Sequence, residues 1–300
     1  MSPKKPRRRP VRGRSPWVRV QKEVHQGYDL RQPLLRRLET HFGGRVFSFF
    51  TSFSHLEAQI TDDDAEMLES ILSDEFGGGS RLVLVINSPG GQALAAERIV
   101  NVCREYSGQR FEVAVPHMAK SAATMICFGA SKIHMSRTAE LGPVDPQVPY
   151  GNNDNWISAE EYVRSYDSLM KEASSGNHKR IEPFIQQLGR YDARSIEQLR
   201  SLQALSKDIS LRMLKSGMMK GETDANILKK IEVFLSQQRT SSHGRMINFG
   251  GAEECGLAVK EIALKSPLWN DLWELFVRSD WVVSHTCTKL IESTASSVHA

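Results

Sequence analysis

Two apolar runs, each followed at once by a turn and then by helical periodicity, constrain the fold of this chain most. The runs are Leu82–Ile86 and Phe111–Val115, and the turns after them are Asn87–Gly91 and Pro116–Lys120. Repetition of a strand, a turn and a crossover helix is typical of α/β proteins with parallel strands and right-handed connections. Ligands of such sheets bind at the carboxyl ends of the strands, so both turns fall where a functional site is expected.

Ser121 stands where the second of these helices begins. Unpaired backbone N–H groups and the positive end of the helix dipole favour negative charge on an oxygen at that position. Gly90 and Gly91 form the other turn, at which a backbone N–H can approach a ligand because no side chain intervenes. A hydroxyl beside such N–H groups is the arrangement of a nucleophile and an oxyanion hole. The alternative for Ser121 is an N-cap, because Ser is among the preferred capping residues.

Several segments resemble, in order along the chain, the signature segments of Clp-fold serine peptidases. The segment Leu84–Gly91 is similar to a motif of ClpP. Ala119–Thr124 and Glu140–Gln147 are similar to the nucleophile turn and the next signature of the serine dehydrogenase proteinase family. Residues within 242–259 resemble the closing strand and helix of these folds. The resemblance covers about residues 45–259 and is strongest to the serine dehydrogenase proteinases, which are related to ClpP and signal peptide peptidase A.

This resemblance implies a fold, an activity and a catalytic triad. The implied fold is α/β, with ClpP/crotonase-like stacked ββα units, a helical insertion and C-terminal helices. The implied activity is that of a serine endopeptidase, which hydrolyses peptide bonds through an acyl-enzyme on Ser121 and uses no metal or other cofactor. The family's triad order of Ser, Asp and His maps onto Ser121, Asp145 and His243.

The resemblance also implies the residues that bind the reacting group. The oxyanion-hole positions of the family map onto the backbone N–H groups of Gly90 and Ala122, and Gly91 is expected to contact the substrate. Peptides or proteins are the implied substrates.

Alternatives stay open for the base and for the acid that orients it. ClpP carries its histidine in the region that corresponds to Leu141–Gln147, where this chain has none. The other interpretation of Asp145 is a turn former that makes an Asx hydrogen bond, and that of His243 is a surface loop residue. A Ser–Lys dyad, as in signal peptide peptidase A, would use Lys171 as the base. A lysine needs desolvation for that role, and the polar surroundings of Lys171 in the sequence favour His243 instead. His117 is a less favoured base because it belongs to the end of a strand, and His134 is expected to be structural.

Composition places the chain among ordinary globular proteins. It has 300 residues, 40% of them hydrophobic and 25% charged, which suffices for a large core. No apolar run is long enough to cross a bilayer, and the basic N-terminus lacks the apolar core of a secretory signal. Cytoplasmic localisation is therefore expected. The four cysteines show no CxxC spacing, so we expect reduced thiols rather than a metal site or disulfides.

The pattern along the chain predicts five regions. Residues 1–16 are a basic, Pro-rich tail that is expected to be disordered and able to contact anionic surfaces. Residues 17–156 are the Clp/crotonase-like core. Residues 157–240 are a helical insertion, which resembles the arm or head of Clp-fold proteins. Residues 241–265 return to the core. Residues 266–300 are an amphipathic helix and a frayed end.

Within these regions the pattern predicts the individual elements. The predicted strands are 45–51, 81–86, 111–115, 132–135 and 246–249. The predicted helices are 29–41, 61–76, 93–106, one from Ser121, one from Ser158, 195–216, 224–238, 251–255 and 267–283. The helix from Ala93 is expected to bury Leu94, Ile99, Val100 and Cys103.

Two rival functions share the same architecture. One is a crotonase-like enzyme that binds an acyl-CoA thioester between two backbone N–H groups. The other is an assembly or scaffold protein whose catalytic residues have decayed, which the missing ClpP-type histidine supports. Under each of these readings, the resemblance to Clp-fold proteins implies a homo-oligomer.

Overall fold

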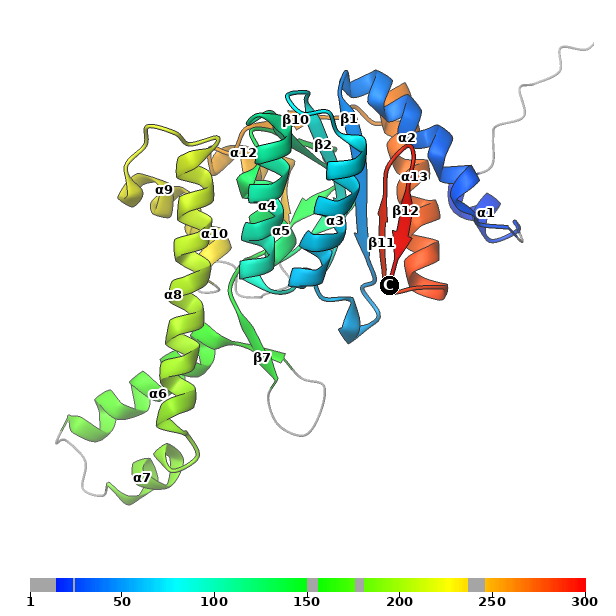
Figure 1. The fold of residues 1–300 in the computed structure, drawn as a ribbon. Coiled ribbons are helices and arrows are strands. Elements are labelled where there is room, and N and C mark those ends of the chain that lie inside the picture. The colour runs from blue at the N-terminus through cyan, green and yellow to red at the C-terminus, as the bar shows by residue number, and fades with distance from the viewer. Residues whose placement is uncertain (1–14, 24, 150–155, 176–180, 237–245) are drawn as a thin grey trace, which may run out of the picture.

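A mixed β-sheet forms the centre of the molecule (Figure 1). The computed structural model describes residues 15–23, 25–149, 156–175, 181–236 and 246–300. Within these residues the largest sheet has the strand order β10-β5-β3-β2-β1-β11-β12. Its strands are β1 (Arg45–Thr51), β2 (Leu82–Asn87), β3 (Phe111–Val115), β5 (Ile133–Met135), β10 (Val259–Glu261), β11 (Lys289–Glu292) and β12 (Ser297–His299).

The middle of this sheet is parallel, as expected. β1 pairs with β2, β2 with β3, β3 with β5, and β5 with β10, each in the parallel sense. Every residue of β2 and β3 is buried, because helices cover both faces of the sheet and leave no polar side to alternate with the apolar one. β1 and β3 have the predicted bounds, and β2 and β5 each begin one residue later than predicted. The ClpP-like α/β architecture is confirmed.

Two layers of helices cover the faces of the sheet. One layer contains α3 (Asp62–Glu75), α4 (Ala93–Ser107) and α5 (Ala122–Gly129), whose apolar side chains share one core cluster with Phe47 and Leu84. The other contains α1 (Pro16–Val20), α2 (Tyr28–Phe42) and α13 (Pro267–His285), which share a second cluster with Val46 and Val83. Alternate side chains of one strand thus enter the two cores.

A long helix connects the core to a projecting arm (Figure 1). This helix, α8 (Ala193–Ser216), packs its C-terminal half in the core through Ile209 and Met213. Its N-terminal half forms the arm together with α6 (Ala159–Ser174) and α7 (Glu182–Leu188). α6 begins where a helix is predicted, and Ser158 caps it by accepting a hydrogen bond from the Glu160 N–H.

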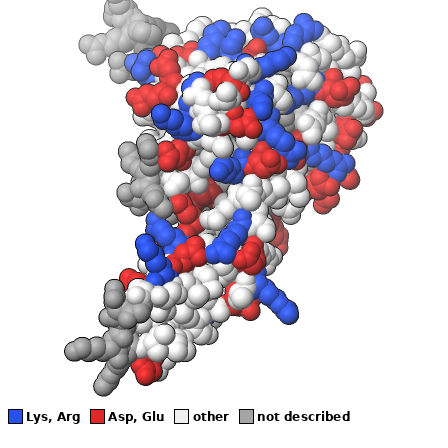
Figure 2. Space-filling view, turned by 90° about the vertical axis from the view of Figure 1, so that its left-hand side faces the viewer, with Lys and Arg blue, Asp and Glu red and all other residues white. Residues whose placement is uncertain are grey.

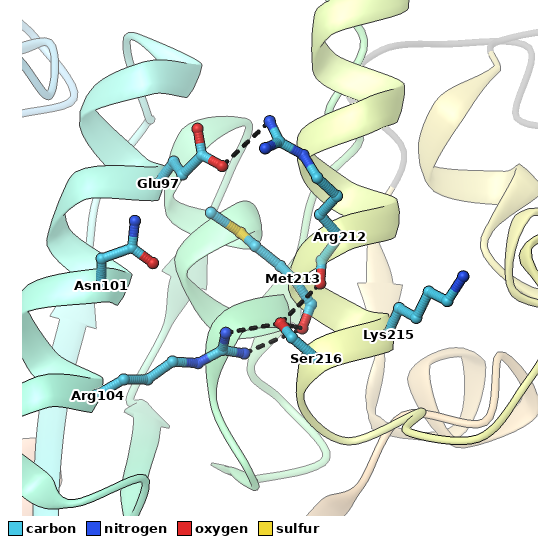
Figure 3. A pocket seen from close by; sticks show the side chains of 7 residues that line it. All are labelled: Glu97, Asn101, Arg104, Arg212, Met213, Lys215 and Ser216. Atoms are coloured by element: carbon cyan, nitrogen blue, oxygen red, sulfur yellow. Dashed lines mark hydrogen bonds and ion pairs between the residues drawn. The ribbon is translucent and has the colours of Figure 1, made fainter.

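Hydrogen bonds fix the C-terminal half of α8 to α4. A hollow of about 460 Å³ separates α8 from α4, and Arg104 reaches across it to the Met213 carbonyl (3.0 Å) and the Ser216 hydroxyl (2.8 Å) (Figure 3). Arg212 in turn pairs with Glu97 at 3.2 Å. On the face that Figure 2 shows, Lys and Arg side chains alternate with Asp and Glu rather than forming a large patch of one sign. The contacts of Arg104 and Arg212 thus join the two helices across the hollow.

Two small sheets and several short elements complete the described structure. A three-stranded sheet has the order β4-β6-β9, and a hairpin pairs β7 with β8. The bounds are β4 (Met118–Ala119), β6 (Glu140–Leu141), β7 (Gln147–Pro149), β8 (Trp156–Ser158), β9 (Ile247–Asn248), the 3-10 turn η1 (Leu56–Ala58), α9 (Asp224–Lys230), α10 (Glu232–Leu235) and α12 (Phe249–Glu254).

The prediction of a frayed C-terminus is wrong. Residues 289–299 form the hairpin β11–β12, and β11 pairs antiparallel with β1. Leu290 and Ile291 are buried on opposite faces of the sheet. The charged ends of β11 are neutralised by distant residues, since Glu292 pairs with Arg31 at 2.7 Å and Lys289 with Asp64 at 2.8 Å. These partners stand far away in the sequence.

Two further predictions need correction. The predicted helix 224–238 is broken at Ile231, whose ψ of 11° ends α9 before α10 begins. Leu94 is 57% exposed rather than buried, because the first turn of α4 faces a groove instead of the core. Ile99, Val100 and Cys103 are buried as predicted. The described part of the chain contains no helix with both the length and the apolar character needed to cross a bilayer.

Candidate active site

The two motif turns lie side by side at the carboxyl edge of the parallel strands. An isolated parallel bridge joins Ser88 to Ala119, with the Ser88 N–H donating to the Met118 carbonyl at 3.1 Å and the Lys120 N–H to the Ser88 carbonyl at 3.0 Å. The segment after β2 is therefore tied directly to the segment that carries Ser121.

Ser121 has a backbone conformation that L-residues rarely adopt. Its φ is 49° and its ψ is −121°, a combination that costs energy of order 1–3 kcal/mol unless the surroundings enforce it. The Ser121 N–H donates to the Pro143 carbonyl at 3.1 Å, which fixes this conformation. Ser121 occupies the N-cap position of α5, yet its side chain makes no capping hydrogen bond. The capping interpretation is therefore wrong, and the hydroxyl is left for another use.

The glycine turn touches the start of α5. A Cβ placed on Gly90, whose φ is +106°, would lie 2.7 Å from the Ser121 Cβ and 3.0 Å from the Ala122 nitrogen. Only glycine permits this approach. Among the described residues, no hydrogen-bond acceptor is recorded for the Ala122 N–H, which belongs to the first turn of α5, where such groups are unpaired. Ala122 therefore presents an N–H group beside the glycine turn.

The two glycine N–H groups differ in their hydrogen bonding. The Gly90 N–H donates to the Ser88 hydroxyl at 3.0 Å. On the far side of the turn, Ile60 donates to the Gly90 carbonyl at 2.9 Å and accepts from the Gln92 N–H at 2.9 Å. Because N–H groups alternate in direction along an extended segment, the Gly91 N–H between them points away from Ile60. No acceptor for it is recorded among the described residues.

A groove of about 790 Å³ runs past these turns. Ser121, Gly90, Gly91 and Asp145 all line it. Four of its lining side chains are large, apolar and exposed, and these are Phe53, Leu94, Trp156 and Leu202. They come from the core, from β8 and from the arm helix α8, so the groove lies between the core and the arm.

Asp145 reaches the groove through the loop that holds Ser121. Pro143 accepts the Ser121 N–H, and the Val144 N–H donates to the Phe234 carbonyl at 2.8 Å. Asp145 follows directly and is only 4% exposed. Thr124 braces the same loop, because its hydroxyl lies 2.8 Å from the Ala119 carbonyl and 2.9 Å from the Gly142 carbonyl. The predicted nucleophile and orienting acid are therefore brought to one groove.

The candidate bases lie in different surroundings. His243 is outside the described residues. Lys171 is exposed in the last turn of α6, on the arm, and does not line the groove. His134 is buried against Glu112 at 2.6 Å, which agrees with its predicted structural role.

His117 and Lys120 make contacts of their own near the nucleophile. The ring of His117 lies against Phe276 (5.0 Å between centroids) and Trp273 (6.4 Å), and burial lowers the pKa of this imidazole. Lys120 forms an ion pair with Glu140. Neither residue lines the groove.

His55 was missed by the sequence analysis. It lies in the loop after β1 and lines the groove with Ser121. No motif marks it, because its position depends on the bridge that ties Ile60 to Gly91. The only sequence signal for His55 is that it lies shortly after the predicted strand 45–51, at the edge of the sheet where ligands are expected.

Comparison with known proteins agrees with this architecture. Residues 28–161 match the model of ClpP-like SDH-type serine proteinases. An uncharacterized protein of Methanocaldococcus jannaschii is 29% identical over 204 residues, which cover 64% of this chain and 65% of the relative. A second uncharacterized protein of that organism is 36% identical over 107 residues, or 36% of this chain and 33% of the relative. The chain thus spans less than two thirds of the length of these relatives.

A solved structure of a mutant membrane-bound stomatin-specific protease is 20% identical, with a TM-score of 0.28, and the match covers 42% of this chain and 63% of that one. This likeness is too weak to support an argument. The family match stands independently of it and includes both motif turns and Asp145. Over residues 28–161 the chain therefore resembles the ClpP-like SDH-type serine proteinases, as its motifs predicted.

Proposed function

We propose that this protein is a serine peptidase whose nucleophile is Ser121. The observation that carries the proposal is the conformation of Ser121, which is held at a positive φ, lines the groove and makes no capping hydrogen bond. A structural serine gains nothing from this strain, whereas a nucleophile gains a fixed direction of attack. The family match supports the same reaction class.

In the proposed reaction, Ser121 Oγ attacks a peptide carbonyl between the start of α5 and the glycine turn. The carbonyl oxygen becomes an oxyanion and accepts hydrogen bonds from the Ala122 N–H and from an N–H group of the glycine turn. Gly91 suits this role better than Gly90, because the Gly90 N–H already donates to Ser88. This assignment replaces the predicted one, in which Gly90 is the donor and Gly91 only contacts the substrate.

A base takes the proton of Ser121 and returns it to the leaving amine, after which water releases the acyl-enzyme. We propose His243 as the base and Asp145 as the residue that orients it. The burial of Asp145 in the groove supports its part in this pair. Lys171, the alternative, is exposed on the arm and does not line the groove.

The apolar lining of the groove supports an extended peptide with apolar side chains as the substrate. Its rim carries Phe53, Leu94, Trp156 and Leu202, and Asp145 and His55 are the ionisable side chains among the described lining residues. Apolar side chains of a bound peptide would cover these apolar rim residues, and the peptide would bring no charged group that lacks a partner in the groove. We also propose a homo-oligomer, which the exposed Ile181 and Ile185 of the arm support and light scattering would test.

Labelling with a fluorophosphonate tests the proposed function. We expect covalent modification of Ser121, located by mass spectrometry, and its loss in Ser121→Ala. Ser54→Ala is the matched control, because Ser54 also lines the groove but is not the proposed nucleophile. We expect Asp145→Asn and His243→Ala to slow labelling strongly, and Lys171→Ala to leave it unchanged. Equal labelling of the wild type and Ser121→Ala would refute the assignment.

A further inference from the structure

Ser88 lies at the centre of a buried hydrogen-bond network beside the proposed oxyanion hole. Its hydroxyl lies 2.8 Å from the hydroxyl of Thr51, at the end of β1, and either group can be the donor. The same Ser88 oxygen accepts the Gly90 N–H at 3.0 Å. Thr51 and Ser88 are both fully buried, so water does not compete for these bonds.

The backbone of Ser88 extends the network to the nucleophile segment. Ser88 donates to the Met118 carbonyl and accepts from the Lys120 N–H, while the Asn87 side-chain carbonyl accepts the Met118 N–H at 2.9 Å. One residue thus ties together β1, the glycine turn and the chain that leads to Ser121. Displacement of Ser88 would change the distance between the glycine turn and the nucleophile.

The network also determines which N–H of the glycine turn is free. With the Gly90 N–H held by Ser88, and the Gly90 carbonyl and Gln92 N–H held by Ile60, both peptide groups that flank Gly91 are fixed. The hydrogen bonds of its neighbours then aim the Gly91 N–H, for which no side-chain acceptor is recorded among the described residues. A preorganised donor of this kind stabilises an oxyanion at no cost of reorganisation.

We infer that Thr51 is a positioning residue of the oxyanion hole and that it acts through Ser88 on the Gly91 N–H. The inference rests on the proposed function. Without the Thr51 hydroxyl, Ser88 loses the partner that fixes its rotamer, and the Gly90 N–H loses a fixed acceptor. Small displacements of a catalytic group reduce rates strongly, so the loss appears in the acylation step rather than in substrate binding.

The test compares rates of fluorophosphonate labelling at Ser121. Thr51→Val keeps the side-chain shape and removes the hydroxyl, and we expect labelling about tenfold slower, with kcat for peptide cleavage lowered and KM unchanged. Thr51→Ser restores the hydroxyl and should label within about twofold of the wild-type rate. Ser107→Ala removes a buried hydroxyl that does not line the groove. It controls for a loss of stability alone, and thermal unfolding measures the stability of each variant.

A double variant separates this network from general destabilisation. Ser88→Ala should slow labelling at least as much as Thr51→Val, and the double variant should be no slower than Ser88→Ala, because both changes act through one hydroxyl. If the wild type labels at Ser121 and Thr51→Val labels equally fast, the inference fails while the proposed peptidase stands. If the wild type does not label, the proposed function fails and the inference with it.

Discussion

Replacement of Gly90 by Ala tests whether the closeness of the two turns matters for function. Gly90 has a φ of +106°, and its Cβ would lie 2.6 Å from the Lys120 carbonyl oxygen and 2.7 Å from the Ser121 Cβ. Both neighbours belong to a segment that hydrogen bonds hold in place. The turn and the nucleophile must therefore move apart to accommodate the methyl group.

The magnitude follows from two separate costs. An L-residue at this φ costs about 1–3 kcal/mol, and the overlap with fixed backbone costs about 1–3 kcal/mol more. We expect a loss of about 2–6 kcal/mol in the free energy of unfolding if the turn keeps its place. If instead the turn shifts, part of that loss is relieved, and a shift of about 1 Å between Ser121 and the oxyanion donors lowers the labelling rate about 100-fold.

The assay measures urea unfolding and fluorophosphonate labelling on the same samples. Gly77→Ala is the matched control, because Gly77 lies in the exposed turn after α3, has no heavy atom within 4 Å of its would-be Cβ and has no positive φ. It should label as the wild type does and unfold within about 1 kcal/mol of it. A Gly90→Ala protein with wild-type stability and wild-type labelling would refute the geometric reasoning.

Three further changes test two buried ion pairs and the groove. Arg31→Met leaves Glu292 charged and buried, so urea unfolding should show a loss of about 3–5 kcal/mol; a loss near zero would contradict the buried pairing. The hydrogen bond from His134 lowers the pKa of Glu112, so the carboxylate stabilises the fold above its unfolded pKa and that contribution is lost as pH falls through the lowered folded pKa. Thermal melting of Glu112→Gln should therefore depend less on pH in the acidic range than melting of the wild type. Leu94→Lys should leave the melting temperature unchanged, because Leu94 is exposed, but should shift cleavage from apolar toward acidic peptides; an unchanged preference in competition assays would show that substrate does not contact Leu94.

Elements with strong periodicity and two buried faces could be predicted from the sequence. The bounds of β1 and β3 agree with prediction, and α4 differs by one residue at its end. Their signals are local, since the apolar residues that make each element are consecutive or recur at helical spacing. The motifs placed Ser121 and the glycine turn at one edge of the sheet for the same reason.

Features that depend on distant partners could not be predicted. β11 begins with Lys289 and ends with Glu292, and charged residues in a terminal segment predict a solvated end. The structure instead buries both, because Lys289 pairs with Asp64 and Glu292 with Arg31. The positive φ of Ser121 depends on the hydrogen bond to Pro143, which no sequence pattern indicates. The choice between the Gly90 and Gly91 N–H groups likewise depends on the rotamer of Ser88. Local sequence thus located the site, while its detailed geometry required tertiary contacts.

The pairing of β1 with β11 has a consequence for biosynthesis. Thr51 ends β1, the loop toward the groove follows it, and the Ser52 N–H donates to the Thr288 carbonyl at 2.9 Å. A nascent chain that has not yet emerged as far as β11 leaves β1 as an open sheet edge and the Ser52 N–H without its Thr288 acceptor. The edge of the sheet beside the groove is therefore completed only after β11 has been synthesised.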